Sequence, residues 1–305
     1  MIEIRRILCP IDFSDYSRRA LDHAVAIARW YGSTITVLHV FAPVPVTTFG
    51  PGVFETFALP GADRGQLLAD TNRFIESEIA PGMAIEAAIR EGNPASEILD
   101  QAASMKADLL VIGSHGRSGF ERLLLGSVTE KVLRKASCPV LTVPRRLSDA
   151  VPAGPVLYKR ILCPVDFSDS SLRALDYAML LAREADAQLA VLHVISHEFE
   201  NVMADVVAPD EHTTVADFRR RREEDIRRRL KDAVPDDVAT YCTVESMLTR
   251  GKSSREILRI AAEQQTDLIV MGVQGRGAAD LTLFGSTTQH VVREATCPVL
   301  TLRQK

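Results

Sequence analysis

The chain consists of two copies of one sequence pattern, and this internal repeat constrains the fold more than any other feature. The segment RRILCPIDFSDYSRRALDHA at residues 5–24 returns as KRILCPVDFSDSSLRALDYA at residues 159–178. The offset is 154 residues at first and becomes 159 from Gly92 and Gly251 onward. A period of this length is too long for a solenoid unit and indicates duplicated domains. We therefore expect domains at residues 1–147 and 155–305, joined by a Pro-, Gly- and Ala-rich linker at residues 148–154.

Each copy alternates short apolar runs with amphipathic segments. In the first copy, strands are expected at residues 6–11, 33–40, 83–91, 107–113 and 138–144. Helices are expected after a cap at Ser14 or Asp15, near residues 67–78, over 95–105 and over 127–136. Alternation of uniformly apolar strands with helices is typical of a parallel sheet covered on both faces. The predicted fold class is α/β, with two doubly wound, five-stranded, Rossmann-like domains.

The fifth expected strand of each copy carries no charge, although it would lie at a sheet edge. Its sequence is VLTV at residues 140–143 and VLTL at residues 299–302. An exposed apolar edge promotes aggregation. Pairing of the two fifth strands within the chain would remove both edges and relate the domains by a pseudo-two-fold axis. Covering by a helix or by another molecule, as in a homodimer, is the alternative.

The overall charge and the apolar runs exclude two classes of partner. With 36 basic and 40 acidic residues, the net charge is −4, so no global field attracts nucleic acid or an anionic membrane. No apolar run approaches the roughly 20 residues needed to cross a bilayer. The first residues, MIEIRRILCPID, do not resemble a secretory signal, and a cytoplasmic location is expected.

Three further features have structural interpretations that we prefer to functional ones. The cysteines lack CxxC or zinc-ligand spacing and are expected to be small, buried apolar residues. The arginine-rich segment at residues 218–232 places acidic residues four positions before arginines, which predicts a solvated helix with i,i+4 ion pairs. His39 and His193 lie inside apolar strands and are expected to be hydrogen-bonded core residues. The apolar segment 41–59 is expected to be a lid, a partner contact or a loop folded on its own domain.

Two signals in each copy lie just beyond a strand end, where open parallel sheets bind ligands. Asp12 and Asp166 follow the first strand, and Gly113 and Gly272 end the fourth. If these strands are neighbours, both signals face one crevice. Glycine accepts positive φ and close ligand approach, and the Gly126–Ser127 step opens a helix whose free amides suit an anion. The chain contains no GxxxxGK[ST] or GxGxxG fingerprint. The residues favour an anion such as phosphate; alternatively, the glycines only form turns and Ser127 only caps the helix.

These motifs resemble the universal stress protein family in its tandem form. The resemblance covers nearly the whole chain, except the linker and the loops around residues 41–65 and 195–216. ATP-binding members of that family carry a glycine, two residues, a second glycine, nine residues, and then glycine followed by serine or threonine. Both copies fit this spacing, with Gly113, Gly116, Gly126 and Ser127 in the first and Gly272, Gly275, Gly285 and Ser286 in the second. The resemblance implies a fold like that of the adenine nucleotide alpha hydrolases, with ATP as ligand, with or without Mg²⁺.

The resemblance also implies a role for each part of the site. The aspartate after the first strand contacts the adenosine, the end of the second strand lines the adenine pocket, and the glycine loop with the Gly-Ser helix start holds ribose and phosphates. In the first copy the implied residues are Pro10, Ile11, Asp12, Val40, Ile112, Gly113, Gly116, Arg117, Gly126, Ser127 and Val128. In the second copy they are Pro164, Val165, Asp166, Val194, Met271, Gly272, Gly275, Arg276, Gly285, Ser286 and Thr287.

Two positions leave the chemistry of these sites open. Arg117 and Arg276 follow the second glycine and would either neutralise phosphate charge or lie in solvent. His115 is replaced by Gln274 in the second copy, so the two sites are expected to differ in affinity or in pH response.

The expected function is ATP binding by a stress-response or signalling protein whose occupancy changes its contacts with an unidentified protein partner. No catalytic residues are expected, because the chain shows no nucleophile elbow, no metal-ligand cluster and no paired general acid and base. A slow ATPase, or a nucleotide-independent scaffold acting through residues 41–59, are the alternatives.

Overall fold

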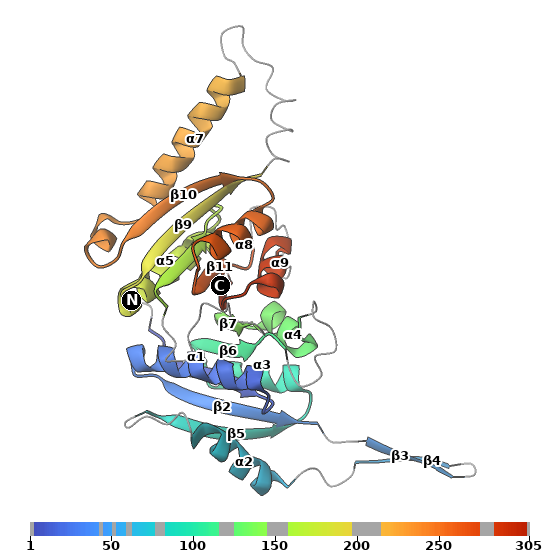
Figure 1. The fold of residues 1–305 in the computed structure, drawn as a ribbon. Helices are drawn as coiled ribbons and strands as arrows, with labels where there is room; N and C mark the ends of the chain where they lie inside the picture. Colours follow the sequence, from blue (N-terminus) through green and yellow to red (C-terminus); the bar gives the residue numbers. More distant parts are fainter. Residues whose placement is uncertain are drawn as a thin grey trace. The chain divides into compact units, whose positions relative to one another are not determined.

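The chain forms two compact α/β domains (Figure 1). The computed structural model describes residues 3–42, 45–50, 53–58, 63–76, 83–115, 125–144, 158–196, 215–274 and 284–303. We refer to the part before residue 145 as domain one and to the part after residue 157 as domain two. The predicted linker at residues 148–154 lies outside the described residues.

Domain one is a parallel sheet of strand order β5-β2-β1-β6-β7 with helices on its two faces. Its strands are β1 (Arg6–Ile11), β2 (Thr34–Phe41), β5 (Ile85–Glu91), β6 (Leu109–Gly113) and β7 (Val140–Val143). Its helices are α1 (Asp15–Tyr31), α2 (Arg64–Glu76), α3 (Pro94–Ser104) and α4 (Ser127–Lys135). The predicted doubly wound α/β fold is confirmed, and α2 begins and ends slightly earlier than predicted.

Domain two repeats this order as β10-β9-β8-β11-β12, again with parallel pairing. Its strands are β8 (Arg160–Pro164), β9 (Gln188–Ile195), β10 (Val244–Arg250), β11 (Leu268–Gly272) and β12 (Val299–Leu302). Its helices are α5 (Asp169–Ala185), α7 (Val215–Asp232), α8 (Ser253–Glu263) and α9 (Ser286–Glu294), and a 3-10 turn, η1 (Asp236–Thr240), precedes β10. The predicted pairing of the two fifth strands, and the pseudo-two-fold relation that depends on it, stay predictions.

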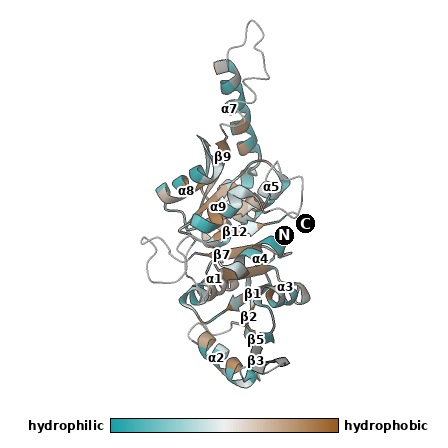
Figure 2. Ribbon diagram, turned by 90° about the vertical axis from the view of Figure 1, so that its right-hand side faces the viewer, coloured by the Kyte–Doolittle hydropathy of each residue, from teal (hydrophilic) through white to brown (hydrophobic). Residues whose placement is uncertain are grey.

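Helix α1 shows how the sequence pattern becomes a packed element. Ser14 is the N-cap, and its side chain accepts a hydrogen bond from the amide of Ser17. The helix ends at Gly32, which has a left-handed φ of 62°. Its predicted apolar stripe is buried against the central strands, whose side chains are mostly apolar (Figure 2). The choice of Ser14 rather than Asp15 as cap is therefore settled.

The apolar segment before α2 contains an antiparallel hairpin rather than a loop. Its strands are β3 (Pro45–Gly50) and β4 (Val53–Ala58), which pair only with each other in a two-stranded sheet among the described residues. Of the three alternatives for this segment, the loop is wrong for the two strands, whereas a lid or a partner contact stays a prediction. Its valines, threonines and phenylalanines favour extended backbone, and this propensity outweighs the expectation drawn from its prolines and glycines.

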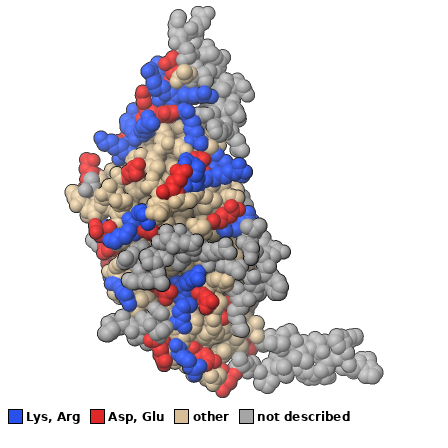
Figure 3. Space-filling view, viewed as in Figure 1, with Lys and Arg blue, Asp and Glu red and all other residues tan. Residues whose placement is uncertain are grey.

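The arginine-rich segment forms the predicted charged helix, α7. Blue and red side chains are mixed along it in Figure 3. Arg227 pairs with Glu223 at 4.0 Å, which is one of the predicted i,i+4 pairs, whereas Arg220 and Arg228 pair with acidic residues three positions earlier. The basic charge of α7 is thus matched in part by its own carboxylates.

The predicted burial of the cysteines is confirmed for three of the five. Cys9, Cys163 and Cys297 are buried, and Cys138 and Cys242 are half-buried. Burial raises the pKa of all five thiols, most strongly for Cys9 and Cys163. No helix in the described part of the chain is long and apolar enough to cross a bilayer.

Candidate functional site

The strand order brings the aspartate after the first strand and the glycine at the end of the fourth strand together at one edge of the sheet in each copy. β1 lies beside β6, with Ile7 opposite Leu109, and β8 lies beside β11, with Leu268 opposite Ile161. The order of strands along the chain reverses between these pairs, so their carboxyl ends form the crevice in which doubly wound folds bind ligands. The condition on which the predicted crevice depended, that strands one and four are neighbours, is confirmed in both domains.

The aspartate of each copy is fixed by a turn that leads into the first helix. Asp12 Oδ1 accepts hydrogen bonds from the amide of Ser14, at 3.1 Å, and from its hydroxyl. Asp166 Oδ1 accepts the equivalent bonds from Ser168, at 3.0 Å from the amide and 2.6 Å from the hydroxyl. Because the same serines cap α1 and α5, each helix start and each carboxylate are held by one small network.

The glycine at the end of the fourth strand is required by close packing. A Cβ on Gly113 would lie 3.2 Å from Tyr16 Cβ, and a Cβ on Gly272 would lie 2.6 Å from Ser170 Oγ and 2.8 Å from its carbonyl carbon. Among the described glycines, positive φ occurs at Gly32, Gly92 and Gly251 only. The expectation that positive φ explains these site glycines is therefore wrong for Gly113 and Gly272. Glycine is needed there because the first helix begins against the strand end.

The Gly-Ser step places a helix start beside the same strand end. Thr129 Oγ1 donates to the Gly113 carbonyl at 2.8 Å, and Thr288 Oγ1 donates to the Gly272 carbonyl at 2.9 Å. The N-caps of α4 and α9 are Gly126 and Gly285, and no side-chain hydrogen bond caps either helix. The alternative that Ser127 only caps its helix is thus not supported. The first amides of both helices remain available to an anion.

A cavity of about 460 Å³ occupies the crevice of domain one. It is lined by all nine of the predicted site residues that are described in this copy, which are Pro10, Ile11, Asp12, Val40, Ile112, Gly113, Gly126, Ser127 and Val128. Seven further lining residues were not among the predicted site residues, although His115 was expected to distinguish the two sites; they are Ser17, His39, Phe41, Pro94, Ile98, His115 and Thr129.

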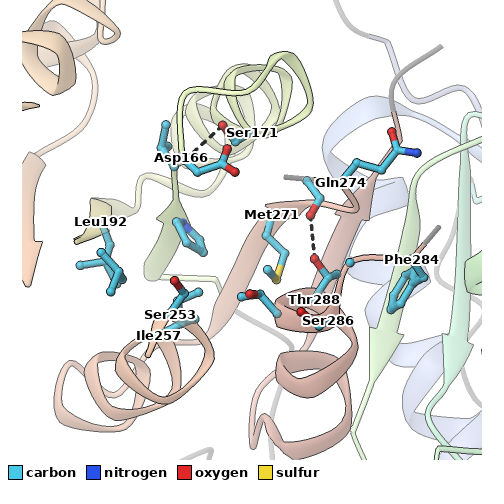
Figure 4. A pocket seen from close by; sticks show the side chains of 16 residues that line it. Asp166, Ser171, Leu192, Ser253, Ile257, Met271, Gln274, Phe284, Ser286 and Thr288 are labelled. Atoms are coloured by element: carbon cyan, nitrogen blue, oxygen red, sulfur yellow. Dashed lines mark hydrogen bonds between the residues drawn. The ribbon is translucent and has the colours of Figure 1, made fainter. Parts of the chain in front are cut away.

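A second cavity, of about 550 Å³, occupies the crevice of domain two. The nine predicted residues described there also line it, which are Pro164, Val165, Asp166, Val194, Met271, Gly272, Gly285, Ser286 and Thr287. The missed residues are Ser171, Leu192, Ser253, Ile257, Gln274, Phe284 and Thr288. Figure 4 shows Asp166, Leu192, Met271 and Thr288 arranged around this space. The predicted residues Gly116, Arg117, Gly275 and Arg276 lie outside the described residues.

Sequence identity between the two copies could have identified several of the missed residues. Three of them, Ser17, Ile98 and Thr129, recur at the same repeat positions as Ser171, Ile257 and Thr288. Identity between the two copies therefore marks cavity residues that the glycine motif does not include. Phe41 and Phe284 carry no such signal, because their counterparts Ile195 and Leu125 differ.

The two strand histidines are hydrogen-bonded, as predicted. His39 Nδ1 lies 3.0 Å from the Ile11 carbonyl, and His193 Nδ1 lies 2.7 Å from the Val165 carbonyl. A ring nitrogen that contacts a carbonyl must donate, which fixes the tautomer and the orientation of each ring. His193 is buried, whereas His39 is half-buried and also lines the cavity of domain one.

The two cavities also differ at the second position after the strand-end glycine, which is His115 in domain one and Gln274 in domain two. Ser114 Oγ lies 2.9 Å from His115 Nδ1, and the His115 and Tyr16 ring centroids are 6.3 Å apart. In domain two, the Gln274 carbonyl accepts hydrogen bonds from the hydroxyls of Ser170 and Ser168. Tyr16 and Ser170 occupy the same repeat position, so each copy has its own way of holding this loop. No cluster of three metal-ligating side chains occurs in the described residues.

Fold and cavities together define a class of protein, a tandem doubly wound α/β protein with one ligand-sized cleft in each domain. The family model described as universal stress protein family matches residues 3–144 and 157–303. The chain therefore belongs to the universal stress protein family, with one family domain in each half.

Similar proteins agree with this assignment. A universal stress protein of Methanocaldococcus jannaschii is 36% identical over 140 residues, which cover 46% of this chain and 81% of that protein. One of Mycolicibacterium smegmatis is 26% identical over 302 residues, which cover 98% of this chain and 97% of that protein. The crystal structure of a universal stress protein from Archaeoglobus fulgidus has a TM-score of 0.62 at 24% identity, covering 99% of this chain and 97% of that chain. This last likeness shows the shared fold.

Proposed function

We propose that each domain binds an adenine nucleotide, namely ATP, in its crevice, and that occupancy controls contacts with a protein partner in stress-response signalling. The observation that carries this proposal is the composition of the two cavities. Each combines one fixed aspartate, an apolar wall and an uncapped helix N-terminus. Their volumes, about 460 and 550 Å³, lie within the usual range for small-molecule sites.

The cavity walls suit the two ends of a nucleotide. Val40 of β2 with Ile98 of α3, and Val194 of β9 with Ile257 of α8, offer apolar area on one side of each cavity. A carboxylate at the strand end is a suitable acceptor for ribose hydroxyls or an exocyclic amine. The amides at the starts of α4 and α9, with the hydroxyls of Ser127 and Ser286, are suitable donors to phosphate. We therefore place the base against the apolar wall and the phosphates at the helix starts.

We propose binding rather than rapid turnover because the described cavity walls lack a feature that would activate water in both copies. The second cavity contains no histidine, and one aspartate is its ionisable lining residue among the described ones. Slow hydrolysis and a nucleotide-independent scaffold remain the competing hypotheses. The three hypotheses predict different nucleotides bound to the protein. Bound ATP supports binding, bound ADP supports hydrolysis, and absence of binding at millimolar ATP supports the scaffold.

Calorimetric titration with ATP, with and without Mg²⁺, tests the proposal. The unmodified chain is expected to bind two nucleotides. The Asp12→Ala and Asp166→Ala variants are each expected to bind one, because each removes the carboxylate from one cavity. Chromatography of the nucleotides released by denaturation then separates ATP from ADP.

The matched control is Asp100→Ala. This carboxylate lies on the exposed side of α3 and does not line the cavity, so both sites should remain. A double variant, Asp12→Ala with Asp166→Ala, that still binds two nucleotides with unchanged affinity would contradict the proposed site. Absence of binding by the unmodified chain would contradict the proposed function itself.

A further inference from the structure

A stack of side chains connects the cavity of domain two to helix α7. Phe167 directly follows the cavity residue Asp166, and its ring centroid is 5.0 Å from that of His193. The guanidinium carbon of Arg229, in the last turns of α7, lies 4.0 Å from the Phe167 ring centroid. His193 itself stands between Leu192 and Val194, which both line the cavity. The three stacked side chains are not among the described residues that line the cavity, so the stack adjoins the cavity through the backbone next to Asp166, Leu192 and Val194 and extends from there to α7.

Phe167 has a backbone conformation that depends on its surroundings. Its φ is 62°, which is unusual for a bulky residue and persists where neighbouring groups enforce it. On one side the ring meets His193, whose own orientation is fixed by its bond to the Val165 carbonyl. On the other side it meets a cation that is attracted to its face. The left-handed turn is thus stabilised by contacts from β9 and from α7.

This turn also determines where the Asp166 carboxylate lies. Asp166 Oδ1 accepts hydrogen bonds from Ser168, so Phe167 is the residue enclosed between the two ends of the turn. A change in the Phe167 backbone would move the carboxylate relative to the cavity. Phe167 is in this sense a positioning residue for the proposed ligand contact.

Among its described side chains, helix α7 has few that are buried against its domain. Ile226 and Leu230 are 5% and 1% exposed, whereas Arg219, Arg220 and Arg221 in its first half are exposed. Figure 1 shows that this half extends beyond β10. An element held by few apolar contacts opens at low free energy. One additional contact, such as that of Arg229 with Phe167, therefore has a measurable effect on its order.

Domain one contains a related stack with a different outer end. Phe13 has a φ of 60°, and its ring centroid is 4.5 Å from that of His39 and 5.7 Å from that of Phe74 in α2. The guanidinium carbon of Arg18, from α1, lies 3.6 Å from the Phe74 ring centroid, and Arg18 also donates to the Phe74 carbonyl. Both domains thus connect the residue after the site aspartate to the helix that lies between the second and third strands of their sheet.

We infer that the stack of His193, Phe167 and Arg229 couples ligand occupancy of the second cavity to the order of helix α7. The coupling rests on the proposed nucleotide binding. A ligand that contacts Asp166 favours the turn in its observed conformation, and the turn presents the Phe167 ring to Arg229. By reciprocity, the docked helix must strengthen ligand binding by the same factor by which the ligand stabilises the docked helix.

Hydrogen exchange of the full chain, measured by mass spectrometry with and without ATP, tests this coupling. Peptides from α7 are expected to exchange about five-fold more slowly when ATP is bound, at the lower end of typical coupling factors. The Arg229→Gln and Phe167→Leu variants are expected to lose this ligand-dependent slowing. In an Asp12→Ala background, where only the second cavity binds, Arg229→Gln should weaken ATP binding about two- to five-fold.

The control is Arg228→Gln on the neighbouring residue. Arg228 pairs with Asp225 on the exposed side of α7, so its replacement should leave both the slowing and the affinity unchanged. If ATP binds two sites but α7 exchanges equally fast with and without it, or is slowed equally in Arg229→Gln and Phe167→Leu, the coupling is wrong. If ATP does not bind the unmodified chain, the proposed function fails first and the coupling with it.

Discussion

The two domains of this chain share one backbone plan but differ in the side chains of their cavities. The strand-end aspartate, the close-packed glycine, the Gly-Ser helix start and the threonine that anchors it occur in both. Where domain one has Ile112, His115 and an aromatic wall at Phe41, domain two has Met271, Gln274 and an aromatic wall at Phe284. Residues that build the frame of the crevice are thus the same, and residues that give it chemical character differ. The two sites are therefore expected to be unequal.

The largest expected difference between the domains is their response to acid. Burial of His23 in α1 lowers the pKa of its imidazole from 6.5 to about 4, and Tyr177 occupies the matching position in domain two. Between these two pH values the unfolded state binds more protons, so domain one loses stability as the pH falls from 6.5 to 4. The loss is about 3 kcal/mol. The acid-dependent loss of stability of domain one can be followed by the fluorescence of Trp30, the chain's one tryptophan, because this residue is part of α1.

Exchange of His23 for the residue of domain two provides the control. The His23→Tyr variant is expected to lose the acid-dependent part of this transition, and an NMR titration of the His23 imidazole in the unmodified chain gives its pKa directly. A measured pKa near 6.5, or equal acid sensitivity of the two domains, would contradict the argument from burial.

The glycines at the strand ends give the next difference. The Gly272→Ala variant places a Cβ 2.6–2.9 Å from Ser170, including backbone atoms, and is expected to destabilise domain two by about 2–3 kcal/mol. Gly113→Ala meets its neighbours at 3.2–3.3 Å and should cost domain one about 1 kcal/mol. Hydrogen exchange of peptides from α5 and α1 reports the two domains separately. Equal losses in both variants would show that the first helix of domain two adjusts more easily than its packing suggests.

The smallest expected difference is a helix cap. Asn93 caps α3 through a side-chain bond from the amide of Ser96, at 3.3 Å, whereas Lys252 at the start of α8 makes no such bond. Asn93→Lys should therefore destabilise domain one by about 1 kcal/mol, and Lys252→Asn should stabilise domain two by a similar amount. Denaturant unfolding of each variant, followed by hydrogen exchange in α3 and α8, checks the two signs. Changes of the same sign in both variants would contradict the assignment.

The fold followed from the sequence because its patterns are local and occur twice. The apolar runs, the Ser14 cap and the strand-end signals each depend on a few neighbouring residues, and repetition in the second copy fixed the domain plan. The crevice was predicted only on the condition that strands one and four are neighbours, and it is the observed pairing of β1 with β6 that brings Asp12 and Gly113 together.

Other features depend on tertiary contacts that no local pattern reveals. The need for glycine at Gly113 and Gly272 comes from the approach of the first helix, not from backbone φ, and only the packed structure shows it. The β3–β4 hairpin was missed because its prolines and glycines suggested a loop. The positive φ of Phe13 and Phe167 had no sequence signal, because bulky residues seldom adopt it.

The adjacency of β1 and β6 also bears on how the protein is made. The two strands are separated by roughly a hundred residues of sequence, so their pairing closes a long loop at a cost in chain entropy. All strands of domain one nevertheless lie before residue 145. Its crevice can therefore be complete on the ribosome before the second half of the chain has been synthesised. Domain one would then be able to bind its ligand before domain two has been synthesised.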